Sequence, residues 1–342
     1  MSNRLLLEVK DLRIHFPIFG GIFQRRVATV KAVDGVSFNV YRGETLGIVG
    51  ESGCGKTTVG RALINITRLM TPDVTISGEI LYHAEDGSVV DFVKLSKSQM
   101  RPYRSKIQMI FQDPYSSLNP RMTVSQIIEE PLELHTKMTK AEMKDRVAWL
   151  LDKVGMRPEQ ATRFPHEFSG GQRQRIGIAR ALATNPDVII CDEPVSALDV
   201  SIQAQVINLM QDLQDEFGLS FIFIAHDLSV VEHISTRIAV MYLGHVVEYG
   251  PSDQVYFAPL HPYSRALLSA VPHANPDSGR ATRVVLHGDV PTPLAKPSGC
   301  PFRTRCPIAR PDCADAFPPF LEKQPQQWVA CPYTTADSEV VV

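Results

Sequence analysis

The sequence lacks several features that assign chains to common protein classes. No apolar run approaches the ~18 residues that a membrane-spanning helix needs. Residues 1–16, MSNRLLLEVKDLRIHF, contain neither the apolar core nor the cleavage site of a secretory signal. The 35 basic and 37 acidic residues leave a formal net charge of -2, which gives no support to a nucleic-acid or anionic-membrane footprint. We therefore expect a cytosolic chain whose membrane role, if it has one, comes through a partner.

Internal repeats and low-complexity tracts are also missing, and what remains is typical of a globular α/β protein. The 342 residues are 44% hydrophobic and 21% charged, so the chain can bury a full core. Short apolar runs alternate with segments of helical periodicity, a pattern that predicts a mostly parallel sheet with helices packed on it. The expected strands are 45–50, 106–112, 187–192 and 220–225, and the clearest helices are 123–135 and 140–155.

The composition divides the chain into two parts. Residues 1–258 contain the alternating strands and helices, with a helical insertion at about 114–168. After residue 258 proline and cysteine become frequent and periodicity is weak, so 259–342 is expected to form a small appended domain.

The strongest chemical signal is the stretch GESGCGKTT, which fits the phosphate-binding pattern G-x-x-x-x-G-K-[ST] between an expected strand and helix. A chance glycine-rich turn is the alternative, and the flanking elements argue against it. Backbone N–H groups of such a loop surround phosphate oxygens, Lys56 contacts the β- and γ-phosphates, and the Thr57 hydroxyl ligates Mg²⁺. Cys54 lies at the helix N-terminus beside Lys56, which predicts a lowered thiol pKa. The expected nucleotide-binding residues are Gly50, Glu51, Ser52, Gly53, Cys54, Gly55, Lys56, Thr57 and Thr58.

A second signal, VIICDEP, places two carboxylates at the end of an expected buried strand. Asp192 is placed to hold Mg²⁺, and Glu193 to orient and polarise the attacking water. The alternative is a strand that simply ends in an acidic turn. A phosphate-binding loop earlier in the chain favours the Mg²⁺-binding and catalytic roles over this alternative.

The stretch FSGGQRQRIGIARAL opens a third expected site, in which Ser169 caps a helix and Gly170, Gly171 and Gln172 begin it. The alternative is a capped helix with a basic face. Between a phosphate loop and a strand ending in Asp-Glu, however, Ser-Gly-Gly-Gln resembles the signature of ABC ATPases. That resemblance implies that these residues bind the nucleotide held by an opposite subunit.

Four further positions follow from the same resemblance. Gln112 in FQDP resembles the glutamine that contacts Mg²⁺ and senses the transporter, and SALD at 196–199 resembles the D-loop. His226 in IAHD resembles the histidine that reaches the γ-phosphate, although a lone histidine after a strand is more often structural. Phe16 is the candidate for stacking on adenine, with the insertion FGGIFQRRVATVK between it and the next expected strand.

Longer stretches narrow the resemblance to the ATPases of oligopeptide and dipeptide importers: FQDPYSSLNPRM, HEFSGGQRQRIGIARAL, HPYSRALLSAVP and the cysteine-bearing tail. Membership implies ATP hydrolysis that drives import at the cytoplasmic face of the membrane. The implied partners are a paralogous ATPase, two permease subunits and an extracytoplasmic binding protein. RRVATVKAVDGVSF and Phe168 resemble the second ATPase of such a heterodimeric pair.

The sequence leaves three alternatives to an active ATPase of a peptide importer. Related importers carry nickel, glutathione or oligosaccharides. A non-transport ABC protein of DNA repair or the ribosome would show basic patches, tandem cassettes or a long coiled coil, which this chain lacks. A pairing subunit with a dead site is disfavoured because Glu193 and His226 are both present.

The C-terminal tail contains Cys300, Cys306, Cys313 and Cys331, with the spacing C-x5-C-x6-C-x17-C. Disulfides are not expected in a cytosolic chain, and four thiolates suit either tetrahedral zinc or an iron–sulfur cluster. The spacing matches neither zinc ribbons nor ferredoxins, so it leaves both metals open. The resemblance to importer ATPases implies a [4Fe–4S] cluster, with Zn²⁺ as the alternative, in a structural role.

Overall fold

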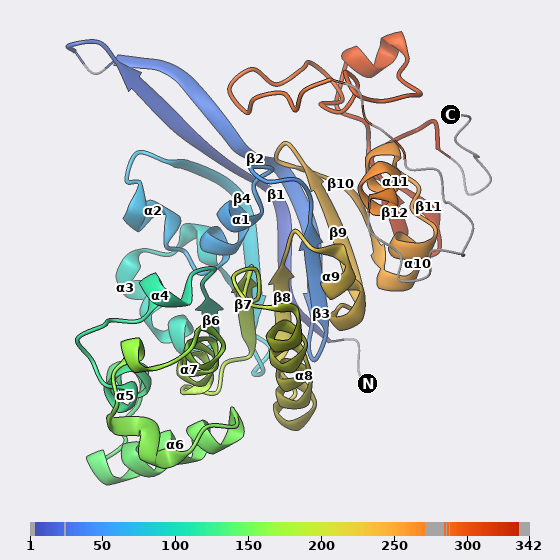
Figure 1. Ribbon diagram of the computed structural model, residues 1–342. Coiled ribbons are helices and arrows are strands. Elements are labelled where there is room, and N and C mark those ends of the chain that lie inside the picture. Colours follow the sequence, from blue (N-terminus) through green and yellow to red (C-terminus); the bar gives the residue numbers. More distant parts are fainter. Residues whose placement is uncertain (1–3, 24, 271–283, 285, 287, 335–342) are drawn as a thin grey trace. The chain divides into compact units, whose positions relative to one another are not determined.

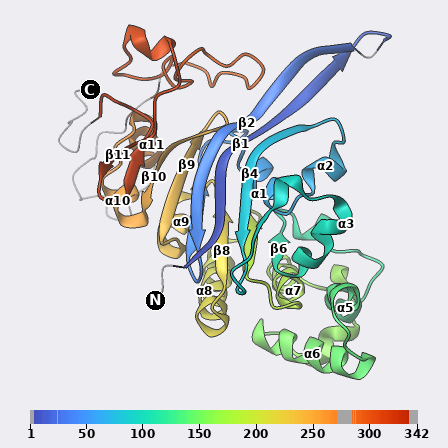
Figure 2. The same ribbon diagram turned by 180° about the vertical axis from the view of Figure 1, so that it is seen from behind.

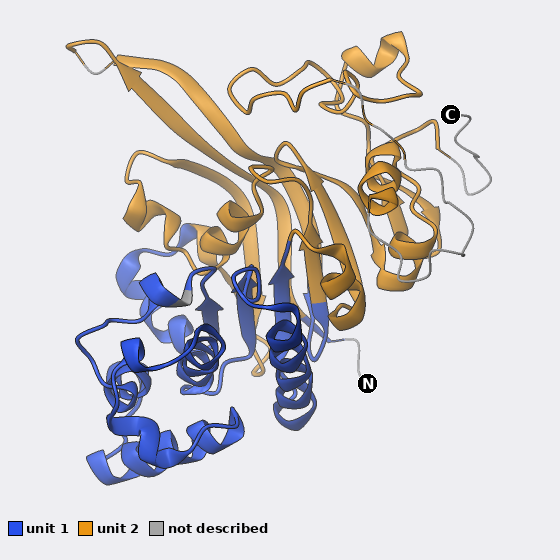
Figure 3. Ribbon diagram, viewed as in Figure 1, with its two compact units in different colours: residues 1–5, 40–45, 94–225 blue, residues 6–39, 46–93, 226–342 orange. Residues whose placement is uncertain are grey.

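A computed structural model describes residues 4–23, 25–270, 284, 286 and 288–334. The chain divides into two compact units, each built from separate stretches of sequence (Figure 3). Unit 1 contains residues 1–5, 40–45 and 94–225, and unit 2 contains 6–39, 46–93 and 226–342.

Unit 1 contains three parallel strands, β6 (Ile107–Ile110), β7 (Val188–Asp192) and β8 (Ser220–Ile224). Ile107 pairs with Val188, and Val188 with Ser220. Every residue of β7 and β8 is buried, which explains why these strands are continuous apolar runs in the sequence. The strands expected at 106–112, 187–192 and 220–225 are confirmed.

All but the last of the α-helices of unit 1 begin at side chains that cap their free N–H groups. Thr123 and Thr139 each form a capping box, with Gln126 and Glu142 as the reciprocal partners. The helices expected at 123–135 and 140–155 are thus confirmed as α5 and α6. The helices are α3 (Lys97–Met100), α4 (Pro114–Ser117), α5 (Val124–His135), α6 (Lys140–Lys153), α7 (Gly170–Leu182) and α8 (Val200–Phe217), with 3₁₀ turns at Arg101–Ser105, Pro158–Thr162 and Pro165–Glu167.

Unit 2 contains a mixed sheet with the strand order β3-β9-β10-β12-β11. Strand β3 (Thr45–Val49) is parallel to β9 (Arg237–Tyr242), and β9 is antiparallel to β10 (His245–Pro251). The sheet continues through two C-terminal strands, β12 (Gln327–Val329) and β11 (Leu321–Gln324). Sequence periodicity did not predict these last two strands, because each is only three or four residues long.

A second, antiparallel sheet of unit 2 has the order β2-β1-β4-β5. Its strands are β1 (Leu5–Gly20), β2 (Arg25–Tyr41), β4 (Thr75–His83) and β5 (Val89–Asp91). Figures 1 and 2 show β1 and β2 as a long hairpin. Phe16 lies on β1. Of the stretch FGGIFQRRVATVK, residues 19–20 end β1 and residues 25–31 begin β2.

Short helices complete unit 2. They are α1 (Lys56–Leu63), α2 (Thr67–Met70), α9 (Leu228–Ile234), α10 (Ser252–Phe257) and α11 (Pro262–Ser269), with 3₁₀ turns at Phe92–Lys94 and Pro311–Ala314. Within the described ranges, none of the helices has both the length and the apolar character that a bilayer crossing requires.

Candidate active site

The phosphate-binding loop follows β3 and leads into α1, as the sequence predicts. Two of its glycines cannot be replaced without moving the backbone. A Cβ on Gly50, at φ 149°, would lie 2.1 Å from the carbonyl oxygen of Met241. A Cβ on Gly55, at φ 109°, would lie 2.4 Å from the carbonyl oxygen of Ala32. The loop is therefore tightly held between neighbouring strands of unit 2.

Lys56 lies in this loop with only 5% of its surface exposed. Its Nζ donates to the carbonyl oxygens of Gly50 at 2.7 Å and Glu51 at 3.1 Å. Thr57 and Thr58 follow in the first turn of α1, where N–H groups and the helix dipole favour an anion. A cation, a helix N-terminus and two hydroxyls together fit a nucleotide phosphate.

Cys54 does not have the lowered thiol pKa that its position at a helix N-terminus predicts. The side chain is 3% exposed, and burial raises its pKa although the nearby charge of Lys56 opposes the shift. That prediction was wrong because loss of hydration outweighs one neighbouring cation.

In unit 1 the structure brings Gln112 and Glu193 together. Gln112 Nε2 donates to Glu193 Oε2 at 2.8 Å. Glu193 has a φ of 47°, uncommon for a residue with a side chain, and its N–H donates to the Ile224 carbonyl oxygen at 2.9 Å. This conformation turns the chain sharply after Asp192, which is 2% exposed at the end of β7. Carboxylate and amide oxygens of this kind suit Mg²⁺.

The Ser-Gly-Gly-Gln stretch begins α7, also in unit 1. The Ser169 Oγ accepts from the Gln172 N–H at 3.4 Å, and the Gln172 side chain accepts from the Ser169 N–H at 3.1 Å. A Cβ on Gly170 would lie 3.4 Å from Leu198, within the predicted D-loop, and one on Gly171 only 2.5 Å from Ile202 Cγ2. The packing of α7 against α8 thus requires glycine at position 171, whereas the contact at position 170 is one that a methyl group could make.

The remaining predicted nucleotide-site positions are placed as follows. His226 is exposed and belongs to unit 2, directly before Asp227, which caps α9. Phe16 is half-buried on β1, also in unit 2. The predicted site residues are thus shared between the units: loop 50–58, His226 and Phe16 in unit 2, and Gln112, Asp192, Glu193 and 169–172 in unit 1.

The four tail cysteines are not joined by disulfides. The Cys300 N–H donates to the Cys313 carbonyl oxygen at 2.8 Å. Burial raises the pKa of Cys306 to about 12, and the neighbouring thiols Cys331, Cys300 and Cys313 add to the rise. Within the part of the chain that the structure describes, however, no three His, Cys, Asp or Glu side chains are grouped so that they could hold a metal ion. As positioned, the cysteines do not fit a metal site.

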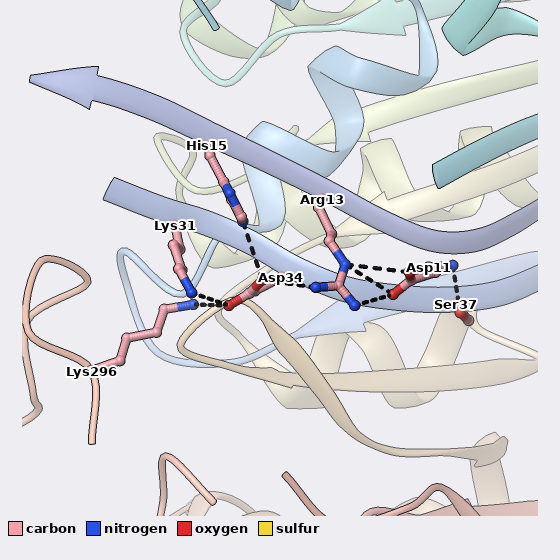
Figure 4. Close-up of polar contacts among 7 residues, drawn as sticks. All are labelled: Asp11, Arg13, His15, Lys31, Asp34, Ser37 and Lys296. Atoms are coloured by element: carbon pink, nitrogen blue, oxygen red, sulfur yellow. Dashed lines mark hydrogen bonds and ion pairs between the residues drawn. The ribbon is translucent and has the colours of Figure 1, made fainter. Parts of the chain in front are cut away.

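Sequence reasoning missed a polar cluster around Asp34 (Figure 4). The Asp34 carboxylate contacts His15 at 3.1 Å, Lys31 and Lys296 at 3.8 Å each, and Arg13 at 3.9 Å. The cluster connects β1 and β2 to the C-terminal region. Because its members are scattered over the sequence, no local pattern marks it.

Comparison with known proteins identifies the relationships of the chain. Residues 33–196 match the ABC transporter family, and residues 247–313 match the C-terminal region of oligopeptide/dipeptide transporters. The chain is 55% identical over 331 residues to the oligopeptide transport ATP-binding protein AppF of Bacillus subtilis, covering 96% of this chain and 98% of the relative. It is 54% identical to OppF of Salmonella typhimurium and of Escherichia coli, covering 96% of each chain.

Solved structures agree with this result. The ATP-binding cassette MJ0796, solved as a dimer in a post-hydrolysis state with ADP and Pi, matches with a TM-score of 0.60 and 27% identity, covering 72% of this chain and 99% of that one. The cbiO1 protein of Clostridium perfringens matches with a TM-score of 0.60 over 74% of this chain and 91% of its own. The chain therefore belongs to the ABC transporter family of ATPases, with the C-terminal region that oligopeptide and dipeptide transporters carry.

Proposed function

We propose that this chain hydrolyses ATP to drive the import of oligopeptides through a membrane transporter. The observation that carries the proposal is the extent of the relationship: 55% identity to an oligopeptide transport ATP-binding protein continues through 96% of the chain, so it includes both the cassette and the C-terminal region. Importers of nickel, glutathione or oligosaccharides remain the alternative cargo classes, because an ATP-binding subunit does not contact the cargo.

Each of the predicted residues has its own role in binding or hydrolysing ATP. Loop 50–58 binds the phosphates, and Phe16 stacks on adenine. Thr57, Gln112 and Asp192 would hold Mg²⁺, which neutralises phosphate charge when it is bound. Glu193 accepts a proton from the attacking water, and the Gln112 amide at 2.8 Å supports this role because it holds the carboxylate in one orientation. His226 contacts the γ-phosphate.

The partners follow from the same proposal. The chain pairs with a paralogous ATPase, and Ser169, Gly170, Gly171 and Gln172 act on the nucleotide of that partner. Two permease subunits hold the pair at the cytoplasmic face of the membrane, and an extracytoplasmic binding protein delivers the peptide. The dimer reported for MJ0796 supports the pairing, as a property of a related cassette.

Glu193→Gln tests the catalytic assignment. We expect it to keep ATP binding and to slow hydrolysis about 10²–10⁴-fold, the usual size of a lost general base. Lys56→Ala is the contrasting variant and should lose nucleotide binding itself. Turnover by Glu193→Gln at the wild-type rate, measured with the partner subunits present, would remove Glu193 from this role.

Peptide uptake tests the cargo. A cell that lacks this subunit should lose uptake of a labelled tripeptide and recover it with the wild-type gene, whereas Glu193→Gln should not restore it. Normal peptide uptake combined with loss of nickel, glutathione or oligosaccharide uptake would assign the alternative cargo.

The four-cysteine tail is proposed as a structural metal site, a [4Fe–4S] cluster or, alternatively, Zn²⁺. Family resemblance supports it, and the positions of the side chains do not. Anaerobically purified protein should absorb broadly near ~400 nm, and Cys306→Ser should abolish the band. One zinc per colourless chain would favour zinc, and four freely titratable thiols in the native protein would exclude both metals.

A further inference from the structure

An arginine of the C-terminal region binds the phosphate loop. The Arg305 guanidinium forms two-pronged contacts with the Glu51 carboxylate, from Nη1 at 3.0 and 3.2 Å and from Nη2 at 3.2 Å. Only 8% of the Arg305 side chain and 27% of the Glu51 side chain are exposed. Arginine forms such paired hydrogen bonds with a carboxylate more strongly than other cations do, and partial burial strengthens them.

Further groups fix the same loop residue from the same side. The Glu51 N–H donates to the Tyr263 hydroxyl at 2.8 Å. The Tyr263 ring packs against the rings of Tyr242 and Phe302, with centroids 4.7 and 5.5 Å away. All three rings are fully buried, so they provide a rigid base. Arg305 follows closely after Phe302 and also donates to the Tyr242 hydroxyl at 3.4 Å.

Glu51 presents an electrostatic problem in a loop that binds phosphate. Its carboxylate adds a negative charge next to the groups that must attract a polyanion. Its own backbone is part of the loop, and its carbonyl oxygen accepts from Lys56 Nζ at 3.1 Å. An unpaired carboxylate here would repel the nucleotide, because like charges a few ångströms apart repel each other, and the repulsion is stronger where the site is partly shielded from water.

We propose that Arg305 is a positioning residue for nucleotide binding: it neutralises Glu51 and, with Tyr263, holds the phosphate loop open for ATP. The proposal rests on the proposed role of loop 50–58 in ATP binding. It gives the C-terminal region a direct function in the ATPase cycle, because a change of the segment around Arg305 alters the charge that the nucleotide meets.

The test is the affinity of the full-length chain for a non-hydrolysable ATP analogue with Mg²⁺, measured by titration calorimetry. Arg305→Ala should weaken binding about ten-fold, the change that corresponds to 1.4 kcal/mol. Glu51→Gln should bind more tightly than wild type, because it leaves Arg305 as an uncompensated cation. The double variant should recover most of the affinity that Arg305→Ala loses.

Arg303→Ala is the matched control, since Arg303 lies on the same segment and its side chain contacts Ser298. It should bind the analogue like wild type. A purely structural role of Arg305 predicts the opposite pattern: weaker binding in Glu51→Gln and no recovery in the double variant, and this result would overturn the proposal. If Arg305→Ala does not fold, weaker binding by Glu51→Gln is sufficient to reject it.

Binding by wild type and by Lys56→Ala tests separately whether loop 50–58 binds ATP, which the proposal for Arg305 assumes. If wild type does not bind the analogue, or Lys56→Ala binds it equally well, the role of loop 50–58 is wrong. If these two behave as expected and Arg305→Ala binds like wild type, only the role of Arg305 is wrong.

Discussion

The thiol of Cys54 should be protected by its surroundings. It is 3% exposed and burial raises its pKa, so little thiolate is present at neutral pH. We expect N-ethylmaleimide at pH 7.5 to modify Cys54 at least about ten-fold more slowly in the native chain than in urea. Peptide mapping by mass spectrometry gives both rates from one sample series. Equal rates would show that the loop opens readily and would return Cys54 to the class of reactive thiols.

His261 should make the protein sensitive to mild acid. It is 2% exposed, and burial lowers its pKa to about 3. Above pH 6.5 the imidazole is neutral in both the folded and the unfolded chain, so it has no effect on stability. Between pH 6.5 and about 3 only the unfolded chain binds the proton, so the free energy of unfolding falls as the pH falls. The expected slope is up to about 1.4 kcal/mol per pH unit.

His261→Asn isolates that contribution. The His261 Nδ1 accepts from the Tyr263 N–H at 3.1 Å as the N-cap of α11, and asparagine can accept the same bond without titrating. Urea unfolding at pH 7 and pH 5 should show a smaller loss of stability in the variant than in wild type. The same loss in both proteins would mean that His261 is protonated in the folded chain.

Two glycines of α7 should respond oppositely to the same substitution. A Cβ on Gly171 would lie 2.5 Å from Ile202 Cγ2, whereas one on Gly177 would meet nothing within 4 Å. The Ile202 side chain is β-branched and cannot easily rotate away. Gly171→Ala should therefore lower the free energy of unfolding by about 1–3 kcal/mol, and Gly177→Ala should raise it by roughly 0.5–1 kcal/mol. Chemical denaturation checks both, and stabilisation by Gly171→Ala would show that α7 and α8 pack less closely.

Elements with a strong local pattern could be predicted from the sequence. The apolar residues of β7 and of β8 are consecutive, and the capping residues of α5 and of α6 lie three positions apart. Each of these signals is therefore contained in a short stretch of sequence. The strands β11 and β12 could not be predicted, because these short stretches are extended only through pairing: β12 pairs with β10, and β11 pairs with β12. The prediction for the Cys54 pKa was wrong for a related reason. The neighbouring lysine is visible in the sequence, but the burial of the thiol is not.

The residues of the candidate site also differ in how far the sequence could predict them. The motifs predicted that a phosphate loop follows β3 and that an acidic pair lies at the end of β7, since each motif is a run of adjacent residues. They gave no sign of Arg305, which lies 254 positions from Glu51 in the sequence. A pair so far apart becomes visible only when the chain is folded.

The complete enzyme should depend on its partner. If Ser169 and Gly170 act on the nucleotide of a paralogue, neither subunit alone has a complete site. The isolated chain should therefore be a weak ATPase whose specific activity rises when the paralogue and the permease pair are added. Steady-state phosphate release at several protein concentrations measures this. Full activity in a verified monomer, independent of concentration, would contradict the composite site.

The pairing of β3 with β9 has a consequence for synthesis on the ribosome. Leu46, just before the phosphate loop, lies beside Arg237, which is made about 190 residues later. At ~5–20 residues per second the nascent loop waits roughly 10–40 s for this neighbour, and longer for Arg305. Until then an apolar strand has no partner on that side, so the emerging chain is open to chaperones. The capacity to bind ATP should thus be acquired only when translation is nearly complete.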